Sequence, residues 1–229
     1  KLFGGYAVKN FIAGDWVDKP QRIEVKNPFD NAVIDTVPKA DAGDLERSLV
    51  FAERGAKVMA KLSSYERWKI LRKAADLMAA RNEEFGQVIS MEEGKIIGEG
   101  RGEASRAVET LMGSAEEAKR IHGETIPLDA DPTGGKKLGF TLRIPCGVVA
   151  AIARFNFPLN LVCHKVGPAL AAGNTVIIKP ASDTPLSANK HTEILLESGL
   201  PPEGIQCITG SGGDIGDALV ADRRVRKVT

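Results

Sequence analysis

Three segments that could take part in chemistry each follow a short apolar run in the second half of the chain. "GVVAAIA" leads into Ala153–Phe157, "TVIIK" leads into Lys179–Thr184, and "IQCIT" leads into the glycine-rich Gly210–Gly216. A short continuous apolar run is typical of a strand that is buried on both faces of a parallel sheet. Ligands bind beyond the carboxyl ends of such strands. The three segments therefore predict one ligand site along a single edge of the sheet.

Each candidate group at this edge has a second, purely structural interpretation. The Asn156 amide is suited to donate to a substrate oxygen, but an asparagine before a helix is also a common helix cap. Lys179 could bind ribose hydroxyls or a phosphate, or its ammonium could reach solvent. The glycine segment lacks a complete G-x-G-x-x-G pattern, because Ile215 stands where the third glycine belongs, so a flexible turn is the alternative.

Strand and helix signals alternate from Gly147 to the last residue. A helix is expected from Pro158 to about Gly173, a second from about Pro185 to Ser198, and a short third within "DALVAD". Short links between alternating strands and helices predict a doubly wound, parallel α/β sheet of the Rossmann type.

The first part of the chain predicts strands followed by helices. A hairpin is expected over Phe11–Val17 with Gly14-Asp15 at its turn, and another strand over Ala32–Val37. Four helices should follow, the first capped by Asp41, the second by Ser63 or Ser64, the third stopped at Gly94 and the fourth over about Glu99–Arg120.

A polar turn at Asp129–Lys137 lies between two strand-like segments and predicts a projecting β-ribbon. Such a ribbon has unpaired edges that could pair with another chain. The expected divisions of the chain are residues 1–124 as an N-terminal part, 125–145 as an oligomerisation ribbon, and 146–229 as a Rossmann-like core.

Composition excludes several classes of function. The 229 residues carry a formal charge of +1, so neither a nucleic-acid surface nor a polybasic membrane surface is indicated. The three cysteines and three histidines are widely spaced and form no metal pattern, so no metal is expected. A reduced, cytoplasmic setting is the default for such a chain.

Several linked motifs resemble those of the aldehyde dehydrogenase superfamily. The chain contains "FNFPLN", "KVGPALAAGNTVIIKPASDTP", "ESGLPPEGIQCITGSG" and "VRKVT", and earlier "FIAGDWV", "NPFDNAVIDTVP" and "HGETIPLD", in the order found in that family. The resemblance extends over nearly the whole chain and implies an oxidoreductase with NADP or NAD as its cofactor. It also implies a homodimer or homotetramer, with a small-molecule aldehyde as substrate.

The resemblance also assigns roles to individual residues. It makes Asn156 the donor that stabilises an oxyanion and Lys179 the residue that binds the adenosine ribose. Ser182 stands where members that prefer NAD often carry glutamate, so NADP should be tolerated. The remaining assignments are cofactor-cleft residues Ala153, Arg154 and Phe155, adenine-side glycines Gly212 and Gly216, and substrate-tunnel residues Phe157, Leu161 and His164.

The family's nucleophilic cysteine and general-base glutamate lie further along than Thr229. This chain should therefore resemble an N-terminal half and be inactive alone, while Cys146, Cys163 and Cys207 should be small buried residues. The implied reaction is oxidation of an aldehyde to a carboxylic acid through a cysteine thiohemiacetal. The alternatives are a dehydrogenase that transfers the acyl group to coenzyme A, and a non-catalytic nucleotide-binding or assembly module.

Overall fold

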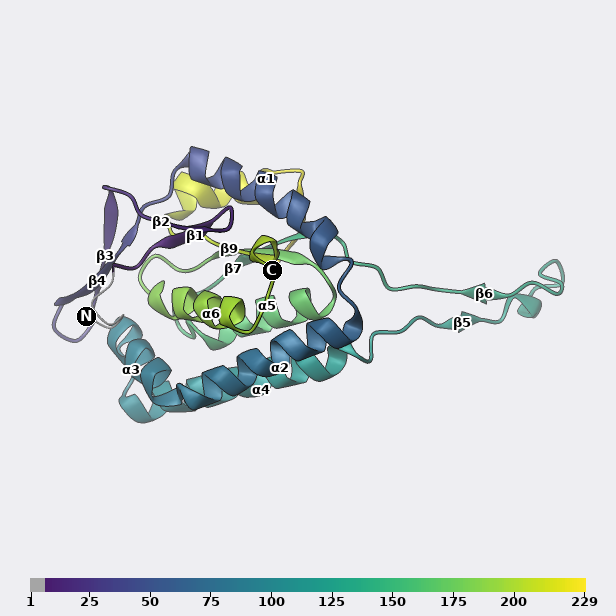
Figure 1. The fold of residues 1–229 in the computed structure, drawn as a ribbon, viewed down its shortest axis with the longest axis horizontal. Coiled ribbons are helices and arrows are strands. Elements are labelled where there is room, and N and C mark those ends of the chain that lie inside the picture. The colour runs from purple at the N-terminus through teal and green to yellow at the C-terminus, as the bar shows by residue number, and fades with distance from the viewer. Residues whose placement is uncertain (1–6) are drawn as a thin grey trace.

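The computed structural model describes residues 7–229, which are built around one six-stranded sheet (Figure 1). Its strand order is β10-β7-β8-β9-β1-β2, and the strands from β10 to β9 are parallel. These strands are β1 (Asn10–Ile12), β2 (Asp15–Val17), β7 (Val148–Ile152), β8 (Thr175–Lys179), β9 (Ile205–Cys207) and β10 (Val225–Val228). The predicted doubly wound α/β class is confirmed. The N-terminal hairpin β1–β2 extends the same sheet through an antiparallel pairing with β9.

Helices cover both faces of this sheet. In β7, Val148 and Ala150 join the core on one face, whereas Val149 and Ala151 join the core on the other. This alternation is the two-residue period of a strand applied to a sheet that is buried twice. The helices α1 (Ala42–Met59) and α7 (Asp217–Ala221) lie on one side, and α5 (Asn160–Ala171) and α6 (Leu186–Glu197) lie on the other (Figure 1).

Three further helices form an outer layer against α5 and α6. They are α2 (Ser64–Ala80), α3 (Asn82–Glu93) and α4 (Ile97–Ala118). Asp41 and Ser63 each form a capping box at the start of α1 and α2, as their side chains predict. The α3 helix ends at Gly94 in the left-handed region, with φ at 86°.

Two predicted boundaries are corrected by the structure. The hairpin turn is Ala13–Gly14 rather than Gly14–Asp15, since both residues have positive φ, 53° and 88°, as a two-residue turn requires. The Gln206 side chain accepts a hydrogen bond from the Ala13 N–H at 2.6 Å and holds this turn. The α5 helix begins at Asn160 rather than at Pro158, and its first N–H groups bond to a side chain of another helix, as described below.

A thin two-stranded arm projects from the body (Figure 1). It contains β5 (Thr125–Ile126) paired antiparallel with β6 (Gly139–Phe140). Large apolar side chains along its second half are exposed, including Leu138, Phe140, Leu142 and Ile144. A separate small sheet pairs β3 (Arg22–Lys26) with β4 (Val33–Pro38). Across residues 7–229, none of the helices combines the length and the apolar character that crossing a membrane requires.

Candidate active site

The three predicted segments lie together at the carboxyl edge of the sheet. Hydrogen bonds join the start of the first to the end of β8, from the Ala153 N–H to the Lys179 carbonyl at 3.0 Å. The Thr184 hydroxyl donates to the carbonyl of Phe155 at 3.4 Å, and the Ser182 hydroxyl donates to the carbonyl of Gly210 at 3.4 Å. Each of these bonds joins residues between 26 and 29 positions apart, and together they link the three segments.

Lys179 is buried at this edge, with 6% of its surface exposed, so its ammonium does not extend into open solvent. Burial lowers the pKa of its side chain. The ammonium donates to the carbonyl of Pro180 at 3.2 Å. An ammonium has three donors, and no second partner occurs within residues 7–229, so two donors remain for oxygens of a ligand.

The glycine segment next to Lys179 leaves room for a ligand. Residues Gly212–Gly216 form a π-helical turn, and the Ser211 hydroxyl accepts from the Asp214 N–H at 3.1 Å. A β-carbon added at Gly212 would meet no described atom within 4 Å, and one added at Gly216 would lie 3.5 Å from the Lys179 Cε. The segment is therefore an ordered turn that is open at Gly212 and lies against the lysine stem at Gly216.

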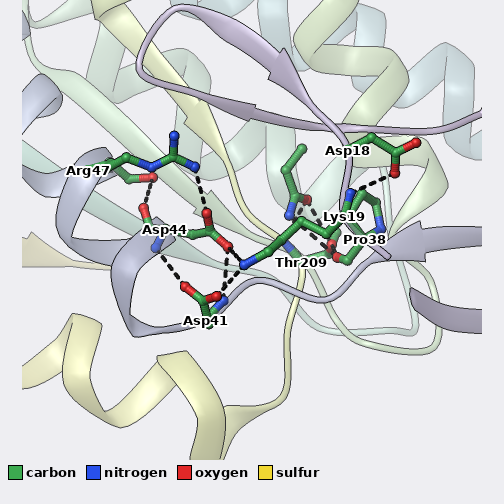
Figure 2. A network of polar contacts seen from close by, with 9 residues as sticks. Asp18, Lys19, Pro38, Asp41, Asp44, Arg47 and Thr209 are labelled. Atoms are coloured by element: carbon green, nitrogen blue, oxygen red, sulfur yellow. Dashed lines mark hydrogen bonds and ion pairs between the residues drawn. The ribbon is translucent and has the colours of Figure 1, made fainter. Parts of the chain in front are cut away.

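A polar network anchors the start of this glycine segment (Figure 2). The Thr209 N–H donates to the Asn10 side-chain oxygen at 3.0 Å. The single proton of the Thr209 hydroxyl is shared between two acceptors, that same oxygen at 2.8 Å and the carbonyl of Pro38. Beside it, Lys19 pairs with Asp41 and Asp44 at the start of α1. The hydrogen bond from Lys19 is the largest cause that lowers the pKa of Asp41. The network fixes β9 to the N-terminal strands just before Gly210.

Asn156 lies in an exposed turn between β7 and α5, and it does not cap the helix. The N-cap residue of α5 is Leu159, and no side-chain cap bond is made there by Asn156. Instead, the Glu103 carboxylate of α4 accepts from the N–H groups of Leu159 and Asn160, at 3.0 and 3.1 Å. The amide of Asn156 makes no hydrogen bond within the described residues, so it is available to a ligand.

Two buried carboxylates that the sequence interpretation missed hold the helices behind the site. Glu103 accepts from the first N–H groups of α5. Glu92 of α3 does the same for α6, where it accepts from the N–H groups of Leu186 and Ser187 at 2.7 and 3.0 Å. Both glutamates are at most 1% exposed. The sequence contains one indication that Glu103 is buried, because Glu103 lies at helical spacing from the small residues Gly100, Ala104 and Ala107, which face the core.

The predicted tunnel and cleft residues lie in the first segment and in α5, and they differ in how exposed they are. Phe157 and Leu161 are half-buried and His164 is exposed, whereas Val162, Cys163 and Val166 face the core. His164 borders a surface hollow with Lys165 and Cys146. Ala153 is buried, while Arg154 and Phe155 are exposed beside the loop after β8.

The cysteines separate into two kinds. Cys163 and Cys207 are fully buried, and burial raises the pKa of the Cys163 thiol far above its usual value and that of Cys207 to about 12. Neither is a thiolate near neutral pH. The prediction that Cys146 is buried is wrong: it lies at an exposed position before β7, where the ribbon returns to the body. Within the described part of the chain, no cluster of side chains is suited to a metal.

The sheet and its helices define a doubly wound α/β protein with a Rossmann-like parallel sheet. The sequence model described as "Aldehyde dehydrogenase family" matches residues 16–229, and the chain belongs to that family. It is 44% identical over 219 residues to 3-sulfolactaldehyde dehydrogenase of Priestia aryabhattai. The aligned residues make up 96% of this chain and 46% of that relative. It is 36% identical over 220 residues to an NADP(+) succinate-semialdehyde dehydrogenase of Escherichia coli, with 95% and 45% covered.

Solved structures agree with this assignment. NADP-dependent glyceraldehyde-3-phosphate dehydrogenase of Bacillus halodurans, complexed with NADP, aligns at a TM-score of 0.94 and 33% identity over 97% of this chain and 48% of its own. Aldehyde dehydrogenase 21 of Physcomitrella patens, in complex with succinate, aligns at 0.93 and 37% identity, with 97% and 46% covered. The chain spans about half the length of the curated relatives it matches. The family expectation is confirmed. Among the solved structures that align, the Bacillus halodurans enzyme is complexed with NADP and PnpE is in complex with nicotinamide adenine dinucleotide.

Proposed function

We propose that the protein containing this chain oxidises an aldehyde to a carboxylic acid with NAD or NADP. One observation carries the proposal: the amide of Asn156 is free of any capping role and lies at the carboxyl edge of the sheet that also carries Lys179. Membership of the aldehyde dehydrogenase family supports the reaction type.

The residues at this edge fit a dinucleotide. Lys179 offers buried donors to ribose hydroxyls, and the open side of Gly212 and the bare Gly216 leave room beside it. Ser182 adds a neutral hydroxyl where a carboxylate would repel a 2′-phosphate, so NADP is accepted as well as NAD. Ala153, Arg154 and Phe155 would line the opposite wall. When bound, the cofactor supplies the acceptor for a hydride.

Asn156 would stabilise negative charge on the aldehyde oxygen. An amide N–H is a neutral donor, and its hydrogen bond strengthens as charge develops on the oxygen after a cysteine thiolate attacks the carbonyl carbon. Cys163 and Cys207 are too deeply buried to be that nucleophile. Cys146 is exposed, but it precedes β7 whereas Asn156 follows that strand, so the two lie at opposite ends of it. We therefore assign the nucleophile and the general base to the rest of the protein. Phe157, Leu161 and His164 would form one wall of the substrate tunnel.

We further propose that the substrate is an aldehyde that also carries an acidic group. Curated relatives of this chain include dehydrogenases named for 3-sulfolactaldehyde, succinate semialdehyde, aspartate semialdehyde and glutarate semialdehyde. Each of these aldehydes carries a sulfonate or a carboxylate. Purified complete protein should reduce NADP or NAD with a panel of such aldehydes and release the free acid. Turnover that requires coenzyme A and yields a thioester would indicate the acylating reaction instead. No turnover with any aldehyde would support a nucleotide-binding module.

The arm at residues 125–145 is proposed as the contact between subunits of a homodimer or homotetramer. Its strands have free edges, and Leu138, Phe140, Leu142 and Ile144 expose between 62% and 81% of their surface. Residues 1–124 and 146–229 are proposed as parts of one cofactor-binding domain, and a cytoplasmic setting suits the three free cysteines.

A further inference from the structure

Lys95 lies between the end of α3 and the start of α4, and its backbone is fixed there. Gly94 ends α3 with a φ of 86°, and the Ser90 hydroxyl donates to the carbonyl of Lys95 at 2.6 Å. Only 14% of the Lys95 side chain is exposed. A lysine held at both its backbone and its ammonium is far less free than an ordinary surface lysine.

The Lys95 ammonium binds the first segment of the candidate site directly. It donates to the backbone carbonyl of Asn156 at 2.8 Å, and it lies 3.7 Å from the centre of the Phe157 ring. Both contacts leave the Asn156 side chain untouched. The lysine therefore fixes the backbone from which the Asn156 amide extends, while that amide stays available to a ligand.

The same ammonium bonds to Glu103, which holds the other end of the segment. One carboxylate oxygen of Glu103 accepts from Lys95 at 2.7 Å, and the other accepts from the N–H groups of Leu159 and Asn160. Glu93 supplies a second carboxylate 3.0 Å from the ammonium. Because Glu103 is fully buried, its charge needs a partner, and Lys95 is the cation in contact with it.

We propose that Lys95 and Glu103 act as a positioning pair for Asn156, clamping residues 156–160 from the α3–α4 layer. This inference rests on the proposed function. A displacement of about 1 Å in a group that contacts the reacting atoms can lower a rate by about a hundredfold. Neither residue is placed to touch the substrate, so their effect should appear in kcat and in the order of the segment, not in cofactor affinity.

The test compares Lys95→Met with Lys119→Met in the complete protein. Both changes keep an unbranched side chain and remove an ammonium that pairs with a glutamate and lies over an aromatic ring. The Lys119 ammonium matches that of Lys95 in this respect, because it lies 3.7 Å from the Glu116 carboxylate and 4.1 Å from the centre of the Trp68 ring. Lys95→Met should lower kcat at least about tenfold with the NADP Kd within about threefold, and Lys119→Met should leave both unchanged. Lys95→Arg, which keeps donors and charge, should recover part of kcat.

Hydrogen exchange of the Leu159 and Asn160 amides gives a readout that does not need turnover. Exchange should accelerate at least about tenfold in Lys95→Met and stay unchanged in Lys119→Met. Glu103→Gln, which keeps an acceptor oxygen without the charge, provides a second variant if Lys95→Met does not fold. It should show the same fall in kcat and faster exchange at these amides.

If the wild-type protein is active and kcat is unchanged in Lys95→Met or Glu103→Gln, the positioning role is overturned, whether or not the exchange rates of the two amides change. Unchanged exchange would overturn the clamp itself. An inactive wild-type protein would refute the proposed function instead, and accelerated exchange would then still support the clamp. These outcomes separate failure of the inference from failure of the proposed function.

Discussion

A glutamate at position 182 should move the cofactor preference of the complete enzyme from NADP towards NAD. The Ser182 hydroxyl is half-buried and bonds to the carbonyl of Gly210 at 3.4 Å, three residues after the buried Lys179. A carboxylate there would lie within reach of the lysine and compete with a 2′-phosphate for its donors. It could still accept hydrogen bonds from the ribose hydroxyls of NAD.

The size of the shift follows from the contact that is lost. A charge-assisted hydrogen bond contributes about 1.5–3 kcal/mol, which corresponds to about a tenfold to hundredfold change in relative kcat/KM. Two like unit charges about 4 Å apart at an effective dielectric of about 20 repel by about 4 kcal/mol. If the new carboxylate contacts the 2′-phosphate, the expected change in relative kcat/KM is therefore about a hundredfold rather than about tenfold.

Steady-state kinetics with each cofactor at saturating aldehyde would measure this shift in Ser182→Glu. The control is Ser182→Ala, which removes the hydroxyl without adding charge and should change the NADP/NAD ratio by less than about threefold. An unchanged ratio in Ser182→Glu would refute the placement of the adenosine ribose beside Lys179.

Three further outcomes are expected. Burial raises the pKa of Glu92 from its usual 4.5 to about 7, so the folded protein holds a proton that the unfolded chain releases. The protonated Glu92 therefore contributes its full amount to the free energy of unfolding below about pH 4.5, and this contribution is lost as pH rises to about 7. The expected fall in the free energy of unfolding over this range is about 3 kcal/mol, and urea unfolding curves of Glu92→Gln should not show it. Gly167→Ala should lower the free energy of unfolding by about 1–3 kcal/mol, because the added β-carbon would lie 2.5 Å from the Ser114 hydroxyl. The control is Gly113→Ala, whose β-carbon would meet nothing within 4 Å and which should leave the melting temperature unchanged or raise it. Phe140→Asp in the exposed arm should lower the oligomer mass in light scattering, and an unchanged mass would contradict a subunit contact there.

Local patterns were sufficient to predict the layout of the site. Continuous apolar runs predicted β7 and β8, and their parallel pairing put Asn156 and Lys179 at one edge. Capping side chains predicted the starts of α1 and α2, because a cap depends on residues three positions apart.

Long-range polar contacts were what the sequence could not predict. The start of α5 depends on Glu103, which is 56 positions before Leu159. Helical spacing can indicate that Glu103 is buried, but it does not identify the Leu159 N–H as its partner. Likewise, a lysine in a turn after Gly94 is indistinguishable by sequence from a surface lysine until its contact with Asn156 is seen. The hairpin β1–β2 joins the sheet by pairing Phe11 with Cys207, which are nearly two hundred residues apart.

The most direct test of the proposed activity is the kcat of Asn156→Ala and Asn156→Asp in the complete enzyme, measured together with NADP Kd and melting temperature. Loss of one donor to a developing oxyanion typically lowers kcat by about a hundredfold to a thousandfold, and a carboxylate at this position would repel the oxyanion. We therefore expect both variants to lose at least about a hundredfold in kcat, with NADP affinity within a few-fold and stability nearly unchanged, since the amide caps no helix. A stable Asn156→Asp enzyme with nearly full kcat would contradict the oxyanion role of Asn156.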